Sequence, residues 1–204
     1  MTTRCRLLAL AFIATVPAAH SASFDLVDIE TVNPRIRLDL RYATAHNFTH
    51  QVLYPRAKCF LRAAVAERLS RAQAELERTG RGLKVFDCYR PLSVQKKMWA
   101  LIPDERYVAD PAKGSRHNRA AAVDLTIVQA GGSEVVMPTA FDDFSERAHR
   151  DCFALPAVAI ENRHLLEAVM TRAGFVGLPT EWWHFDAEGW ESYDVLDVDL
   201  TELR

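Results

Sequence analysis

The sequence lacks a surplus of basic residues, internal repeats and low-complexity tracts. Its 204 residues include 25 Lys and Arg against 27 Asp and Glu, a formal net charge of −2. A chain with this balance has no general electrostatic attraction for nucleic acid or for an anionic membrane. Because 49% of its residues are hydrophobic, the chain is long and apolar enough for one globular domain with a substantial core.

The first 23 residues differ from the rest. Arg4 and Arg6 precede an apolar run over residues 7–16, which a proline and small residues follow. This pattern is typical of a secretory signal peptide, and the run is too short to span a membrane. We expect cleavage after Ser21 or Ser23. The alternative is an N-terminal helix buried in the domain.

Cleavage would leave one domain, residues 24–204, in the periplasm or outside the cell. It removes two arginines and no acidic residue, so 25 − 2 leaves 23 basic against 27 acidic groups, a net charge of −4. No cysteine directly follows the apolar run, and we therefore expect no lipid anchor and no stable attachment to a membrane.

Cysteine is scarce, and no C-x-x-C pair is present. This spacing disfavours a structural zinc site. Three cysteines follow the predicted signal peptide: Cys59, Cys88 and Cys152. An exported protein meets an oxidising compartment in which two of them can pair. We favour Cys59 with Cys88. Three buried thiols are the alternative, because sequence alone does not fix disulfide connectivity.

Apolar periodicity predicts both strands and helices. Alternation over residues 35–41 predicts the strand that opens the sheet, and β-rich segments predict strands over 83–89 and 120–128. Apolar positions that recur every three to four residues predict helices over 61–78 and 162–172, each followed by a glycine.

A short helix is expected between the second and third strands. Ser93 can cap its first turn, and the pattern ends at Trp99. These elements predict an α+β fold, a single domain with a small, mostly antiparallel sheet packed by helices.

The stretch "GSRHNRAAAVDL" contains His117 and Asp124 on either side of small residues. A turn that carries an imidazole and leads into a strand that carries a carboxylate could bring the two groups together. His184, in "PTEWWHFD", could add a third ligand. Two nitrogens and one oxygen, with a fourth position for water, are how catalytic zinc is held. The alternative is a hydrogen-bonded surface pair.

Glu181 lies three residues before His184. Peptide hydrolysis at a metal also needs a base for the proton of water and an acid for the departing amine, and a carboxylate that is not a ligand can serve as both. Residues three apart point to opposite faces of a strand. We therefore expect Glu181 in the turn after Pro179 and His184 in the strand that follows, with Trp182 and Trp183 packed in the core. The alternative is a strand end with a hydrogen-bonded histidine.

Arg90, in "DCYRP", supplies a permanent positive charge. The following proline favours an extended backbone, so the guanidinium could be held against an oxyanion. An ordinary structural ion pair is the alternative. His46, His50, His149 and His164 are expected to lie at the surface or in local hydrogen bonds.

Two of these motifs also resemble family signatures. "SRHNRAAAVD" resembles S-x-H-x-x-G-x-A-x-D, and "EWWH" resembles E-x-W-H, in the zinc D-alanyl-D-alanine dipeptidases, the VanX-like branch of peptidase family M15. The segments "DLRYATAHNFT", "DCYRP", "MPTAFDDFSERAH" and "GFVGLPTEWWHFD" look like that branch in the same order. The resemblance covers nearly all of the chain after residue 23 and implies the D,D-peptidase/hedgehog-like zinc fold.

The resemblance assigns a role to each matching position. It implies that His117, Asp124 and His184 hold one Zn²⁺ per chain, that Glu181 is the general base and acid, and that Arg90 stabilises the tetrahedral transition state. Asp142 would receive the substrate's free amino group, and Tyr42 and Ser115 would also bind substrate.

This chain departs from the family pattern at two positions. Ala120 stands where the signature has glycine, and His46 stands where relatives have aspartate. If position 120 needs a positive φ, alanine adds a little strain. Neither change removes a catalytic group.

The resemblance implies hydrolysis of the dipeptide D-Ala-D-Ala, or of close D,D-dipeptides, by metal-activated water in cell-wall peptide turnover. Two rivals stay open: a zinc D,D-carboxypeptidase that trims peptidoglycan stem peptides, and a zinc-containing binding domain without catalysis. The oligomeric state does not follow from the sequence.

Overall fold

A five-stranded mixed sheet organises the chain. The computed structural model describes residues 25–204, so the predicted signal peptide lies outside the described residues. In spatial order the strands are β2 (Arg37–Leu38), β4 (Arg81–Asp87), β5 (Ala122–Gln129), β7 (His184–Ala187) and β6 (Phe175–Gly177). Only the β2–β4 pair is parallel. The predicted α+β class and mostly antiparallel sheet are confirmed.

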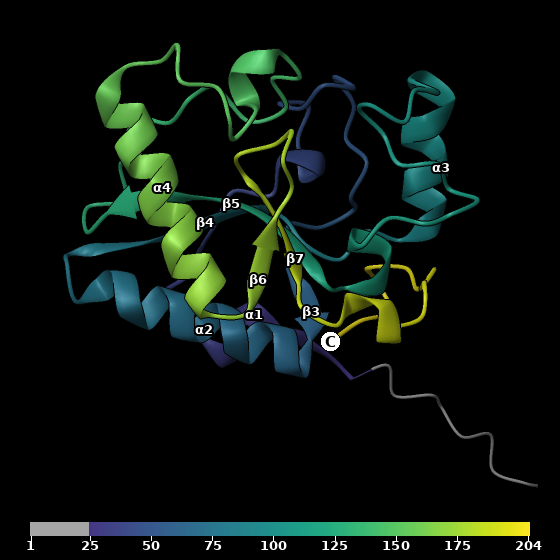
Figure 1. Ribbon diagram of the computed structural model, residues 1–204. Helices are drawn as coiled ribbons and strands as arrows, with labels where there is room; N and C mark the ends of the chain where they lie inside the picture. Colours follow the sequence, from purple (N-terminus) through teal and green to yellow (C-terminus); the bar gives the residue numbers. More distant parts are fainter. Residues whose placement is uncertain (1–24) are drawn as a thin grey trace, which may run out of the picture.

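Helices and a second, two-stranded sheet surround these strands. The second sheet pairs β1 (Leu26–Asp28) with β3 (Phe60–Arg62) in antiparallel fashion. The helices are α1 (Ile29–Val32), α2 (Ala63–Glu77), α3 (Leu92–Leu101) and α4 (Ala157–Arg172). Helices α2 and α4 pack on the large sheet and on each other, whereas α3 lies apart from them (Figure 1). None of the helices in the described part is long and apolar enough to cross a membrane.

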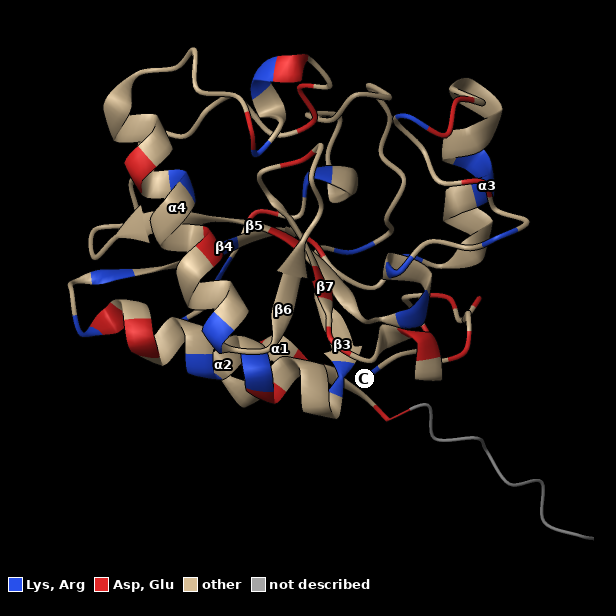
Figure 2. Ribbon diagram, in the orientation of Figure 1, with Lys and Arg blue, Asp and Glu red and all other residues tan. Residues whose placement is uncertain are grey.

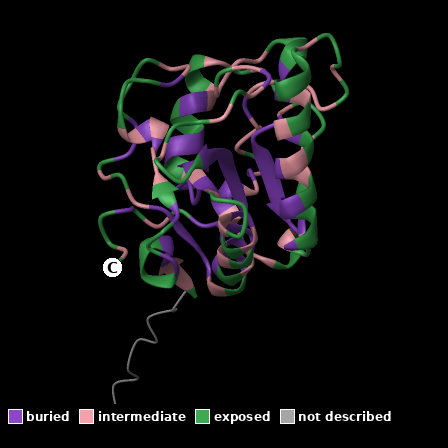
Figure 3. Ribbon diagram, turned by 90° about the vertical axis from the view of Figure 1, so that its left-hand side faces the viewer, coloured by how far each residue is buried: buried purple, intermediate pink, exposed green. Residues whose placement is uncertain are grey.

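The core follows the predicted apolar positions. In α2, the apolar side chains Val65, Leu69, Ala72 and Leu76 are all buried. The central strands β4, β5 and β7 are buried along most of their length, and the helices alternate buried and exposed residues (Figure 3). This is the burial expected for amphipathic helices on a covered sheet.

Several element boundaries differ from their predictions. The segment 35–41 forms a strand only at Arg37–Leu38, because it lies at the sheet edge and pairs with β4 alone. The helix predicted over 61–78 begins at Ala63, since residues 60–62 belong to β3. The last helix begins at Ala157, after a proline, rather than at residue 162.

The predicted Ser93 cap is wrong. Pro91 occupies the N-cap of α3, and the helix continues to Leu101 rather than ending at Trp99. Ser93 instead donates its backbone N–H to Asp197 Oδ1 at 2.6 Å. A carboxylate from the C-terminal segment therefore satisfies a helix donor that a local side chain usually satisfies.

The favoured disulfide is confirmed. Cys59 and Cys88 are bonded, with Cα atoms 5.4 Å apart, and Cys152 is a free, half-buried thiol. The bond joins the residue before β3 to the residue after β4, so it links the small sheet to one end of the large one.

Candidate active site

All eight residues singled out from the sequence line one cavity of about 570 Å³. They are Tyr42, Arg90, Ser115, His117, Asp124, Asp142, Glu181 and His184. Strand register explains the centre of this group: Asp124 of β5 faces Asp87 of β4 on one side and His184 of β7 on the other. Acidic positions on β5 and β7 accordingly lie near the middle of the molecule (Figure 2).

Three buried atoms form a triangle in this cavity. His117 Nε2 lies 3.2 Å from His184 Nδ1 and 3.4 Å from Asp124 Oδ1, and the latter two atoms are 2.9 Å apart. Ligands at about 2.0–2.1 Å from a tetrahedral metal are separated by roughly 3.3 Å. The three side chains form the His–Asp–His group that could hold a metal ion, as predicted.

Hydrogen bonds fix which nitrogen of each imidazole faces the triangle. His117 Nδ1 lies 2.7 Å from the carbonyl oxygen of Cys88, which can only accept, so Nδ1 is the donor. His184 Nε2 lies 2.9 Å from Asp186 Oδ1 and donates to that carboxylate. The remaining nitrogens, His117 Nε2 and His184 Nδ1, point at Asp124 and are the atoms available to a metal.

The centre is electron-rich and favours a cation. Burial alone would raise the pKa of Asp124, but His117 and His184 hold it well below its usual range. Burial alone would lower the pKa of His184, but hydrogen bonds to Asp124 and Asp186 raise it to about 10. A proton and a metal ion therefore compete for His184 Nδ1, and a divalent ion satisfies all three atoms at once.

Glu181 lies in the turn before β7, and His184 is the first residue of that strand, as predicted. Glu181 Oε2 is 3.9 Å from His184 Nδ1, so the carboxylate adjoins the triangle without joining it. Burial, and after it the charge of Asp124, raises the pKa of Glu181. A carboxylate whose pKa is shifted toward neutrality is suited to exchange protons.

Arg150 holds this turn in place, a role that the sequence did not indicate. Its Nε donates to the Leu178 carbonyl at 2.9 Å, and its Nη2 donates to the carbonyls of Trp182 and His184, each at 3.0 Å. Its guanidinium occupies the space beside Gly177, where an added Cβ would lie 2.3 Å from Cζ. Backbone carbonyls at both ends of the turn are thus bonded to one largely buried cation, whose side chain is 9% exposed.

The tryptophans of the turn are packed, as expected. Trp182 and Trp183 are almost fully buried, and their rings meet edge to face. Trp182 Nε1 donates to Thr139 Oγ1 at 2.9 Å, and its backbone N–H donates to the Ala148 carbonyl at 3.0 Å. Trp183 also lines the cavity.

Arg90 is oriented by two partners. Its Nε and Nη2 donate to Asp87 Oδ2 at 3.1 and 2.6 Å, and its Nη1 donates to Gln95 Oε1 at 2.8 Å. A guanidinium has five N–H donors, so one N–H on each terminal nitrogen remains. The structural ion pair considered above is present, and Arg90 nevertheless also lines the cavity.

The other end of the cavity carries Asp142. The Tyr42 hydroxyl donates to its Oδ1 at 3.1 Å, and the Phe48 N–H donates to its Oδ2 at 3.3 Å. Burial, and then the charge of Asp124, raises the pKa of Asp142 to about 7. No cation is bonded to this carboxylate among the described residues, so it can receive a positively charged group.

Ser115 lies under the turn that carries His117. Its Oγ accepts the backbone N–H of His117 at 3.3 Å, and its own N–H donates to Asn118 Oδ1 at 2.7 Å. The contacts in this structure make it a support for His117 as well as a cavity residue.

Some supporting residues were missed at the sequence level. Asp186 follows His184 by two positions on one strand, a spacing that places both on the same face and could have indicated their contact. Asp87 precedes Arg90 by three, but nothing in that spacing predicts its bond to the Tyr54 hydroxyl at 2.6 Å. His46, His50 and His164 are exposed as expected, whereas His149 lies on the cavity wall.

Comparison with known proteins agrees with this geometry. The family model described as "D-ala-D-ala dipeptidase", Peptidase M15, matches residues 22–198. The chain belongs to this family of peptidases. A D-alanyl-D-alanine dipeptidase of Escherichia coli is 37% identical over 176 residues, 86% of this chain and 91% of that protein.

Two further similarities have lower identity. A D-alanyl-D-alanine dipeptidase of Enterococcus faecalis is 30% identical over 171 residues, 74% of this chain and 85% of that protein. The solved structure of VanYB in complex with D-Alanine-D-Alanine is 17% identical and has a TM-score of 0.45, over 68% of this chain and 77% of that chain.

The contact between Gly177 and Arg150 generates a prediction for this M15 peptidase. Gly177→Ala should expel the guanidinium and remove its hydrogen bonds to three carbonyls, of which those of Leu178 and His184 keep a backbone donor. The loss should lower the free energy of unfolding by about 1–3 kcal/mol. Urea denaturation at equilibrium measures the change. Gly131→Ala is the control, because nothing lies within 4 Å of its added Cβ.

A double-mutant cycle tests the cause. If Gly177→Ala acts by displacing Arg150, it should add little to the destabilisation of Arg150→Ala. Full additivity of the two changes would show that another contact is responsible.

Proposed function

We propose that this chain is a zinc-dependent D-alanyl-D-alanine dipeptidase that hydrolyses the free dipeptide D-Ala-D-Ala or close D,D-dipeptides. The observation that carries the proposal is the placement of two groups in one cavity: the His117–Asp124–His184 triangle and the cation-free carboxylate of Asp142. The first suits attack on a peptide bond, and the second suits a free amino group. The names of the relatives support the same substrate.

The donor set fits zinc. Two imidazole nitrogens and one carboxylate oxygen, with room left in the cavity, match a catalytic zinc site, whereas a structural site is closed and rich in cysteine. When bound, zinc acidifies water and polarises the substrate carbonyl. His117, Asp124 and His184 would hold a single ion, and the bonds to Cys88 and Asp186 keep both rings in the tautomers that this requires.

The residues around the triangle supply the proton transfers. Glu181 would take a proton from the attacking water and return it to the departing amine, for which its raised pKa is appropriate. The two remaining N–H groups of Arg90 would donate to the oxyanion of the tetrahedral transition state. Asp87 and Gln95 keep that guanidinium from turning away.

Asp142 would select dipeptides by receiving the substrate's ammonium group. A longer or acylated peptide has no ammonium at this point, so its binding would leave the half-buried carboxylate without a charged partner. The rings of Phe48, Phe144 and Tyr107 are in successive contact along the same wall. This apolar lining makes the unpaired charge more unfavourable.

A substrate panel tests the activity. D-Ala-D-Ala hydrolysis should be lost with a chelator and restored by Zn²⁺, and Glu181→Gln should lower kcat by about 10²–10⁴ while metal content stays the same. Glu146→Gln is the control, since this exposed carboxylate lies on the same cavity wall.

Equal or faster cleavage of N-acetyl-D-Ala-D-Ala would favour the carboxypeptidase rival. Metal loading without any D,D-peptide hydrolysis would favour the binding domain.

The raised pKa of Asp142 gives a pH dependence. Below its pKa of about 7 the carboxyl group is neutral and cannot pair with the ammonium, so kcat/KM should rise as the pH approaches 7. It should fall again above about pH 8 as the substrate's amino group loses its proton. Asp142→Asn should raise KM and abolish the increase of kcat/KM between acid pH and pH 7 that the ionisation of Asp142 causes. If the variant keeps that increase unchanged, Asp142 is not the group that pairs with the substrate's ammonium.

We also propose that the protein is exported and acts on dipeptides released by cell-wall turnover. The signal-peptide pattern of residues 1–23 supports export, and the buried Cys59–Cys88 disulfide suits an oxidising compartment. Cell fractionation with N-terminal sequencing should find the chain outside the cytoplasm and beginning near residue 22 or 24. An intact N-terminus on a cytoplasmic protein would contradict export.

A further inference from the structure

The segment that follows β4 leaves the sheet at the active site. Pairing of β4 with β5 ends at Asp87 opposite Asp124, just after a register irregularity. Residues 88–90 therefore have no ladder hydrogen bonds to fix them, although the backbone of Cys88 and the side chain of Arg90 both serve the site. Their position must come from other contacts.

The backbone of Cys88 orients His117. Its carbonyl accepts the Nδ1–H of His117 at 2.7 Å, which turns Nε2 toward Asp124. Its N–H donates to Asp87 Oδ1 at 2.9 Å, and Asp87 Oδ2 in turn holds Arg90. The backbone of one residue thus connects a proposed metal ligand to the residue proposed to bind the oxyanion.

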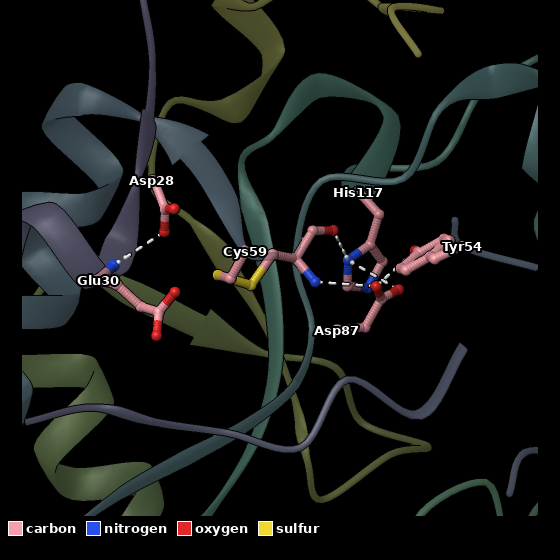
Figure 4. The surroundings of a disulfide bond; sticks show 7 residues. Asp28, Glu30, Tyr54, Cys59, Asp87 and His117 are labelled. Atoms are coloured by element: carbon pink, nitrogen blue, oxygen red, sulfur yellow. Dashed lines mark hydrogen bonds and ion pairs between the residues drawn. A yellow bond between two sulfur atoms is a disulfide. The ribbon is translucent and has the colours of Figure 1, made fainter. Parts of the chain in front are cut away.

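The side chain of Cys88 anchors this part of the backbone. It is bonded to Cys59, and both cysteines are essentially inaccessible to solvent. One backbone bond runs beside the disulfide, from the Tyr89 N–H to the Phe60 carbonyl at 3.1 Å. Figure 4 shows Tyr54, Asp87 and His117 gathered on one side of the disulfide.

We propose that the Cys59–Cys88 disulfide is a positioning element of the metal site, which fixes the Cys88 carbonyl and through it the orientation of His117. This inference rests on the proposed metal-dependent function. Without the bond, residues 88–90 are held by fewer contacts, and the His117 ring loses its fixed acceptor. Loss of a partner of this kind typically weakens metal binding by about 10–100-fold.

The test compares zinc affinity with and without the disulfide. Cys59→Ala combined with Cys88→Val removes the bond while refilling the space of the sulfur atoms. Competition with a chromogenic chelator should give a Kd for Zn²⁺ about 10–100-fold higher than that of the wild-type chain. A Kd equal to the wild-type value would overturn the proposal.

Leu76→Ala separates positioning from general stability. Leu76 is buried in α2, whose C-terminal end packs near the start of β4, at the opposite end of the strand from Asp87. This variant should melt at a lower temperature and keep the wild-type Kd for Zn²⁺. If it weakens zinc binding as much as the cysteine double variant does, the effect of the disulfide is only structural and the proposal fails.

A second measurement applies if the double variant does not fold. The wild-type chain, folded with its disulfide, is treated with a phosphine reductant, and zinc release to the chelator is followed together with the number of free thiols. Release should accelerate once the two additional thiols appear, and an unchanged rate would contradict the inference. A wild-type chain that binds no zinc contradicts the proposed function instead, so the two failures are distinguishable.

Discussion

The rest of the site depends on a single electrostatic constraint, the approach of three ligand atoms from two adjacent strands, β5 and β7, and from the turn that precedes β5. His117 Nε2, Asp124 Oδ1 and His184 Nδ1 lie 2.9 to 3.4 Å apart in a buried setting. Such an arrangement is unfavourable unless a cation neutralises it. The surrounding hydrogen bonds, to Cys88 and Asp186, hold the two rings in the orientation in which a proton or a divalent cation is shared among the three atoms. Forming this binding site therefore lowers the stability of the metal-free folded chain.

Two devices outside the sheet keep these atoms in place. Strand register positions Asp124 and His184, but His117 and Glu181 lie in turns, where no ladder hydrogen bonds act. The disulfide stabilises the segment against which His117 rests, and Arg150 stabilises the turn of Glu181. The first is a buried covalent bond, and the second is a charged side chain that is mostly shielded from solvent. Catalytic groups on loops need this kind of support if they are to be held within a fraction of an ångström.

The sequence was sufficient to find the side chains that meet in the cavity and insufficient to find those that hold them in place. His117, Asp124, Glu181 and His184 stand in motifs of recognisable composition and converge as expected. Arg150 was not predicted, because its three acceptors are backbone carbonyls, which every residue has. The strand over 35–41 came out short and the Ser93 cap was wrong for a related reason. The position at the sheet edge limits the strand, and the carboxylate of residue 197 replaces the cap. A local sequence pattern shows neither of these contacts.

Ala120 shows how such a fold accommodates a departure from its signature. The residue has φ +55°, so the position does use the left-handed backbone that favours glycine. That conformation costs alanine about 1–2 kcal/mol. Glycine at this position would destabilise the folded state in two other ways. The greater entropy of its unfolded chain would cost about 0.4–1 kcal/mol, and the lost burial of a methyl group would cost about 0.8 kcal/mol. Ala120 is fully buried in the cluster that includes Tyr42 and Tyr54, so the methyl group has contacts to lose. The two residues are therefore nearly equal in free energy here, and the turn that carries His117 can keep its shape with either.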